Sequence, residues 1–258
     1  MTRPTGWLPD PAPSAELLGA GRAHVATLAA SDLPDAGGIE RAPWILSQTG
    51  ESCTGHFGAQ ALHLLGAKQH SPYHPWAFAR AYDAGGVDRI RDTGCSAGAF
   101  TRALREHGAC SWDDWHPGAE NFAIVPREDD RFAALPPALA RLRAQRFNLD
   151  LMPLYGSGDE LVRAVAAELH AGHPVGLVVH ADAEFQRLRF EDEVPREPAD
   201  GPGDHIGTLS RFRRWGDGSL RFLFTNSWGV TWSSGGMAWL PESWVRASSL
   251  VISARGYS

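Results

Sequence analysis

The spacing of apolar residues changes from helical to alternating between the two halves of the chain. After Cys53, Phe57, Ala61 and Leu62 recur at helical steps up to Gly66, which predicts a helix beginning near Cys53. Similar spacing predicts helices over 72–84, 97–107, 137–146 and 159–170. β-rich runs separated by glycine-rich turns predict strands at 175–179, 207–213, 220–225, 237–240 and 250–253. The pattern therefore indicates an α+β fold with a helical lobe and a β lobe.

Composition indicates a globular protein without a nucleic-acid or membrane role. The 258 residues, 43% of them hydrophobic, suffice for a large core. The net charge of −6 includes no Lys/Arg block, and no apolar run reaches the roughly 20 residues that span a bilayer. The N-terminus lacks the apolar stretch of a secretory signal, and three cysteines fit a reducing compartment. We therefore expect a cytoplasmic location.

Three residues with complementary chemistry follow one another along the chain: Cys53 at the predicted helix start, His205, and Asn226 about twenty residues later. A thiolate can attack a carbonyl carbon, and an imidazole can exchange its proton with the thiol and a leaving amine. An amide can orient the imidazole. The helix start and a nearby imidazolium favour the thiolate, so this order predicts a cysteine nucleophile with its base.

The segment 226–229, Asn-Ser-Trp-Gly, together with Trp232 resembles the Asn-Ser-Trp-Gly-x-x-Trp motif of the papain-like cysteine peptidases. The segment 203–205 suits the histidine motif of that family, and Thr54 after the nucleophile resembles its bacterial-type branch. The resemblance spans roughly residues 43–258. It implies a two-lobe fold in which the helical lobe carries the cysteine and an antiparallel β lobe carries the histidine and asparagine.

The resemblance also implies the chemistry, which is hydrolysis of peptide amide bonds through a thioester acyl-enzyme without a cofactor. Gln48 precedes Cys53 by five residues, whereas the family normally has six. This shorter turn leaves open whether the Gln48 amide reaches the oxyanion. The implied roles are Cys53 as nucleophile, His205 as general base and acid, Asn226 as orienter of the imidazole, Gln48 as oxyanion donor, and Trp228 as a shield over the Asn226–His205 contact.

Substrate contacts are expected at Gly98 and Trp228, with Met152 and Gly203 as further pocket positions. Gly98 matches the family glycine whose backbone pairs with an extended peptide. The alternative is that this glycine only permits close packing at a helix start. The stretch from Glu191 to Asp204 is rich in acidic residues, and we hypothesise that it favours basic substrates. A solvated loop without substrate contacts is the competing interpretation.

Residues 1–42 are rich in Pro, Ala and Gly and are expected to form an arm or a short pro-segment. Residues 43–258 would form the catalytic domain, with its lobes divided near residues 125 and 126. Cys95 resembles a family cysteine, but Gly50 occupies the position of its usual disulfide partner, so only a bridge to Cys110 remains possible. The spacing of the eleven histidines does not predict a metal site.

Two other functions use the same residues. A transpeptidase or acyltransferase would keep the Cys-His-Asn site and replace water by an amine. A papain-fold binding module would keep the fold without turnover. The oligomeric state and the natural substrate do not follow from the sequence.

Overall fold

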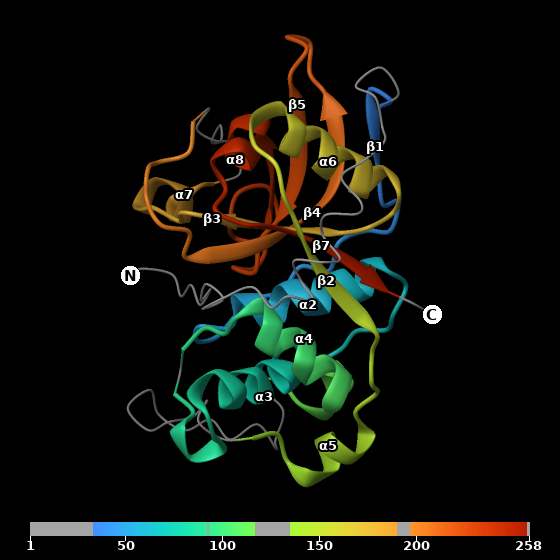
Figure 1. The fold of residues 1–258 in the computed structure, drawn as a ribbon, viewed down its shortest axis with the longest axis vertical. Coiled ribbons are helices and arrows are strands. Elements are labelled where there is room, and N and C mark those ends of the chain that lie inside the picture. Colours follow the sequence, from blue (N-terminus) through green and yellow to red (C-terminus); the bar gives the residue numbers. More distant parts are fainter. Residues whose placement is uncertain (1–32, 92, 117–134, 190–196, 257–258) are drawn as a thin grey trace.

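The computed structural model describes residues 33–91, 93–116, 135–189 and 197–256. These residues form two stacked lobes, and helix α2 (Cys53–Leu64) lies between them (Figure 1). The sequence prediction of an α+β fold with two lobes is confirmed. The helix predicted to begin near Cys53 does begin at that residue.

The helical lobe packs short helices against α2. Ser96 caps the helix that follows it, because its Oγ accepts a hydrogen bond from the N–H of Ala99 at 3.3 Å. Gly85, with a φ of +73°, ends the preceding helix in the left-handed conformation. The elements of this lobe are α3 (Tyr73–Ala84), η1 (Val87–Arg89), α4 (Ala97–Glu106), η2 (Trp112–Asp114) and α5 (Ala138–Arg143).

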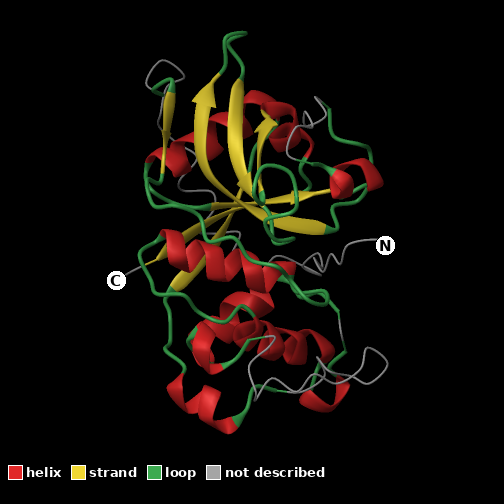
Figure 2. Cartoon of the chain, turned by 180° about the vertical axis from the view of Figure 1, so that it is seen from behind, coloured by secondary structure: helices red, strands yellow, loops and turns green. Residues whose placement is uncertain are grey.

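The β lobe is built on one antiparallel sheet with the strand order β2-β7-β3-β4-β5-β6, and β1 pairs with β4. Figure 2 shows the curved strands of this sheet together with the helices of the lobe. The strands are β1 (Ala36–Gly38), β2 (Leu149–Leu154), β3 (Val175–Val179), β4 (His205–Arg214), β5 (Leu220–Thr225), β6 (Met237–Pro241) and β7 (Val251–Gly256). The helices are α6 (Gly158–His170), α7 (Ala183–Arg187) and α8 (Glu242–Ala247).

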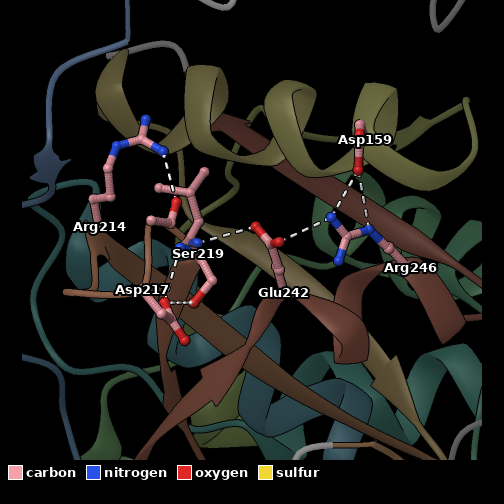
Figure 3. A network of polar contacts seen from close by, with 8 residues as sticks. Asp159, Arg214, Asp217, Ser219, Glu242 and Arg246 are labelled. Atoms are coloured by element: carbon pink, nitrogen blue, oxygen red, sulfur yellow. Dashed lines mark hydrogen bonds and ion pairs between the residues drawn. The ribbon is translucent and has the colours of Figure 1, made fainter.

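Polar contacts join α6 and α8 to the start of β5 (Figure 3). Arg246 Nη2 lies 2.7 Å from Asp159 Oδ1 and 2.8 Å from Glu242 Oε1. The other carboxylate oxygen of Glu242 accepts a hydrogen bond from the backbone N–H of Leu220 at 3.0 Å. One carboxylate therefore connects α8 to β5 as well as to Arg246.

The domain division expected from the sequence stays a prediction, and two structural details lie near its boundaries. Residues 36–38, which were expected in an N-terminal arm, form β1 and extend the sheet along β4. The expected lobe boundary near 125 lies outside the described residues. Beyond it, α5 still belongs to the helical lobe, where Ala140 packs in the same apolar core as residues of α3 and α4.

The core between the lobes determines where the candidate site forms. Phe57 and Ala61 of α2 belong to the same buried cluster as Val178 of β3, Ile206 of β4 and Ile252 of β7. Helix α2 therefore packs directly against the sheet. This packing brings the first residue of α2 next to the beginning of β4.

Candidate active site

His205 and Asn226 form a buried pair in the β lobe. His205 is the first residue of β4 and Asn226 follows the last residue of β5, and neither is exposed to solvent. His205 Nε2 lies 2.8 Å from Asn226 Oδ1. Trp228 stacks on the imidazole with ring centroids 4.4 Å apart, which keeps water away from this hydrogen bond.

Cys53, the first residue of α2, lies against the beginning of β4. Its side chain is fully buried, and its sulfur accepts a hydrogen bond from the backbone of Ile206, the residue after His205. Backbone and hydroxyl groups of Thr54 also hydrogen-bond to the thiol. The structure therefore brings together Cys53, His205 and Asn226, which are far apart in the sequence.

Burial controls the ionisation of the thiol and the imidazole. It raises the pKa of Cys53 to about 12, although hydrogen bonds from Ile206 and Thr54 oppose this shift. Burial also lowers the pKa of His205 to about 4, while its hydrogen bond to Asn226 acts in the other direction. Both shifts favour the neutral thiol and imidazole. The sequence analysis expected the helix start to favour the thiolate. In the structure, burial of the charged sulfur raises the pKa of Cys53 by more than the helix start lowers it.

Gln48 lies beside Ser227, and its amide is held at both ends. Its Nε2 donates to the carbonyl of Gly50 at 3.1 Å, and its Oε1 accepts a hydrogen bond from the hydroxyl of Ser227. The backbone N–H of Gln48 also donates to the carbonyl of Ser227 at 2.6 Å. The short turn from Gln48 to Cys53 therefore keeps the amide beside the segment that carries Asn226.

A second imidazole supports this turn. His56 lies one helical turn after Cys53, and its Nδ1 donates to the carbonyl of Ser52 at 2.8 Å. Ser52 in turn donates its hydroxyl to the carbonyl of Thr49 at 3.0 Å. Burial lowers the pKa of His56 to about 4, and nearby His205 contributes in the same direction. His56 is therefore a neutral support of the turn at neutral pH.

The four expected substrate positions lie in different surroundings. Gly98 lies in the first turn of α4, and Trp228 covers His205. Gly203 lines a cavity of about 20 Å³, and a Cβ there would come within 2.4 Å of Val178 Cγ1. Met152 lies on β2 opposite Ser253 and is not brought near Cys53 by any described contact. Substrate binding by these residues stays a prediction.

Glu191, Asp192 and Glu193, on which the hypothesis of a preference for basic substrates depends, lie outside the described residues. The described end of the same stretch lies against His180. His180 Nδ1 is 3.0 Å from the carbonyl of Pro202. The hypothesis therefore stays a prediction.

Gln60 has a structural role that the sequence analysis missed. Its Nε2 donates to the carbonyls of Trp44 and Asn226, each at 3.3 Å, and its Oε1 accepts from the hydroxyl of Thr208 at 2.6 Å. The available signal was a polar residue three positions after Phe57, on the apolar face of the predicted helix. Ser227 was visible inside the Asn-Ser-Trp-Gly motif, but no role had been inferred for it.

All three cysteines, Cys53, Cys95 and Cys110, are buried free thiols. In the part of the chain that the structure describes, no group of three or more His, Cys, Asp or Glu side chains could hold a metal ion. No helix among the described residues is long and apolar enough to cross a membrane.

Solved structures of cysteine proteases share this architecture. Xylellain, a cysteine protease from Xylella fastidiosa, matches with a TM-score of 0.67 and 16% identity over 100% of this chain and 98% of its own. ProCathepsin B S9 from Trypanosoma congolense matches with a TM-score of 0.62 and 14% identity over 99% of this chain and 87% of its own. The chain has the papain-like fold. The family resemblance of the sequence motifs is thus confirmed at the level of the fold.

The bromelain protease from Ananas comosus, solved in complex with the E64 inhibitor, also has this fold. It matches with a TM-score of 0.60 and 13% identity over 86% of this chain and 99% of its own. No family model matches the sequence, and no curated protein does. At these identities, the comparisons establish the papain-like fold, and the chemistry must be inferred from the residues.

Proposed function

We propose that this protein is a cysteine peptidase that hydrolyses peptide bonds, with Cys53 as nucleophile and His205 as general base and acid. The observation that carries the proposal is the 2.8 Å contact between His205 and Asn226 beside the buried thiol. The cysteine proteases with the same fold support it. Peptides or proteins are accordingly the proposed substrates. The cytoplasmic location stays a prediction.

Asn226 determines which nitrogen of His205 acts as the base. Asn226 Oδ1 also accepts the backbone N–H of Ser227 at 2.7 Å, so it is the oxygen that faces His205. An acceptor oxygen requires a proton on Nε2 of the imidazole. Nδ1 is then the basic nitrogen; it is buried and has no hydrogen-bond partner among the described residues.

The proposed reaction begins from the neutral pair. His205 Nδ1 takes the thiol proton as the Cys53 sulfur attacks the carbonyl carbon, and then gives this proton to the leaving amine as the C–N bond breaks. The product of this step is a thioester on Cys53. The same nitrogen next takes a proton from water, which attacks the thioester, and the released thiolate recovers the proton.

We assign the oxyanion to the backbone N–H of Cys53 and to Nε2 of Gln48. The N–H groups at the start of a helix have no acceptor within that helix, so the Cys53 N–H is suited to this role. Gly50 and Ser227 hold the Gln48 amide in place before substrate binds. Donors fixed in advance stabilise the negative charge that develops in the transition state.

An active-site label and a peptide library test this proposal on the full chain. We expect an epoxide of the E64 type to modify Cys53, identified by mass spectrometry, and the library to show cleavage. Cys53→Ala should abolish cleavage without changing Tm, whereas Cys110→Ala should retain it. Cleavage by Cys53→Ala at the wild-type rate would contradict the assignment.

The same measurements separate the other candidate functions. Amine adducts that exceed hydrolysis products at millimolar added amine would indicate a transpeptidase or acyltransferase. A binding module would give neither cleavage nor selective labelling of Cys53. His205→Ala should be nearly as damaging as Cys53→Ala, and the double variant little worse, because residues of one catalytic unit are strongly non-additive.

A further inference from the structure

A fixed segment leads from the candidate active site to a surface cavity. Gly229 donates its N–H to the carbonyl of Leu46 at 2.8 Å, and Ser47 forms a β-bridge with Trp228. Further back, the carbonyl of Trp44 accepts a hydrogen bond from Gln60 at 3.3 Å. Residues 44–48 are therefore held in place from the cavity up to the proposed oxyanion donor Gln48.

The cavity has a volume of about 320 Å³. This value lies near the lower end of the ~300–1,000 Å³ typical of small-molecule pockets, so the cavity suits one large side chain rather than a folded partner. The rings of Trp44 and Trp112 meet edge to face with centroids 5.3 Å apart. No charged side chain is among the described lining residues, which are Trp44, Ile45, Leu46, Ser47, Gln69 and Trp112.

We propose that this cavity binds an aromatic or large aliphatic side chain of the peptide substrate on the leaving side of the scissile bond. The inference rests on the proposed function and adds a determinant of substrate choice to it. His205 must reach the leaving amine, and Trp228, which stacks on His205, pairs with Ser47 at the edge of the cavity. A peptide that continues past His205 on this side therefore runs toward the cavity.

Two distance estimates indicate which residue of the substrate would reach the cavity. Gln60, which contacts Trp44, follows Cys53 by seven residues, or about 10 Å along the helix. Trp44 precedes Gln48 by four residues, which span at most about 14 Å. An extended peptide advances about 3.3 Å per residue. The third or fourth residue beyond the scissile bond would therefore reach the cavity.

Matched peptides and a filled cavity test this inference. One substrate has Trp at the third and fourth leaving-side positions, a second has Gly at both, and a third ends after the first leaving-side residue. We expect wild-type kcat/KM to be about 10- to 100-fold higher for the Trp peptide than for the Gly peptide. Gln69→Trp, at an exposed lining position, should remove this preference and leave the short peptide unaffected. Lys68→Ala, its exposed neighbour outside the lining, should keep the preference.

A second measurement is independent of catalysis. A leaving-side peptide with Trp at the third and fourth positions should bind Cys53→Ala by calorimetry, and Gln69→Trp in that background should weaken the binding at least tenfold. Equal kcat/KM for the Trp and Gly peptides would overturn the cavity assignment while leaving the peptidase proposal intact. Loss of an equilibrium dimer in Gln69→Trp, with unchanged kinetics, would assign the cavity to a second copy of the chain and also overturn it. Absence of both cleavage and Cys53 labelling would instead remove the proposed function.

Discussion

Ser227 and Gly50 fix the amide of Gln48 from opposite ends. The hydroxyl of Ser227 donates to Oε1, which identifies the other end of the amide as Nε2. Gly50 accepts a hydrogen bond from Nε2 at 3.1 Å. The shorter turn therefore removes one residue without separating Gln48 from the segment that carries Asn226.

The first prediction compares Gln48 with its support. Gln48→Ala should lower kcat about 10²- to 10³-fold with a smaller effect on KM, because an oxyanion donor acts mainly in the transition state. Ser227→Ala keeps the amide but removes the hydroxyl that donates to its oxygen, so it should cost less. Steady-state kinetics with one peptide measures both. A loss in Gln48→Ala below roughly fivefold, with chemistry limiting the rate, would show that the oxyanion depends on other donors.

The second prediction concerns the ionisation of Cys53. With a pKa raised to about 12, the thiol is protonated at neutral pH and its thiolate fraction rises about tenfold per pH unit. The rate of Cys53 alkylation by iodoacetamide should therefore keep rising from pH 6 to above pH 9. The same thiol in urea-unfolded protein should instead level off near its ordinary pKa of about 8.5. A folded-state plateau between pH 5 and 8 would indicate a preformed thiolate–imidazolium pair.

The elements that the sequence predicted well are those with a clear pattern and a clear end. The helix predicted over 97–107 begins directly after Ser96, whose hydroxyl caps it, and the buried strand Val175–Val179 is a continuous apolar run. Strand β2 was missed because it contains Asp150 and Pro153 and lies at the edge of the sheet, where proline is tolerated. Short elements such as β1, α7 and α8 offer too few residues for a period to show.

In the candidate site, too, some residues could be predicted from a sequence pattern and others could not. Cys53, His205 and Asn226 were predictable because they stand at the ends of predicted elements and match a motif. The support by Gln60 was not predictable, because its contacts with Trp44, Asn226 and Thr208 depend on how α2 is rotated against the sheet. The packing of Phe57 against Gly176 of β3 contributes to this rotation, and no local sequence pattern shows it.

The third prediction concerns a carboxylate that connects α6 to β7. Glu168 accepts hydrogen bonds from Ser253 at 2.5 Å, Arg255 at 2.5 Å and His173 at 2.9 Å. These hydrogen bonds together lower its pKa from 4.5 to about 2, against the opposing effect of burial. The carboxylate therefore stabilises the fold above the unfolded-state pKa, and this stability is lost as the pH falls from about 4.5 toward 2.

Glu168→Gln should lower the free energy of unfolding by about 3 kcal/mol at pH 7, because it leaves Arg255 without its counter-charge. The loss should be smaller at pH 3, where wild type has already lost part of this stabilisation. Urea unfolding at both pH values measures the difference. Glu106→Gln, in an exposed pair with Arg102, is the matched control and should show no comparable change. Equal destabilisation by Glu168→Gln at both pH values would contradict the linkage.

At the scale of the whole molecule, the proposed catalytic groups come from different lobes and must be held in register. Cys53 belongs to the helix between the lobes, and His205 and Asn226 belong to the sheet. The apolar core brings these elements together, but hydrophobic contacts do not by themselves fix the orientation of α2 relative to the sheet. Hydrogen bonds join Gln60 of α2 to the Asn226 segment, to β4 and to Trp44, and they fix the orientation of α2.

The last prediction tests this role of Gln60. Gln60→Leu keeps a side chain of similar size but leaves the Thr208 hydroxyl and two carbonyls without this partner, at about 1–3 kcal/mol for each buried group left unsatisfied. We expect a lower free energy of unfolding and a fall in kcat larger than the change in KM, because the Asn226 segment loses its link to α2. Thr208→Val is the matched control, since it removes one of the three hydrogen bonds and should affect kcat less. Because the two residues share a hydrogen bond, the double variant should destabilise by less than the sum of the single changes. Additive losses, or an unchanged kcat in Gln60→Leu, would show that apolar packing alone sets the register of the lobes.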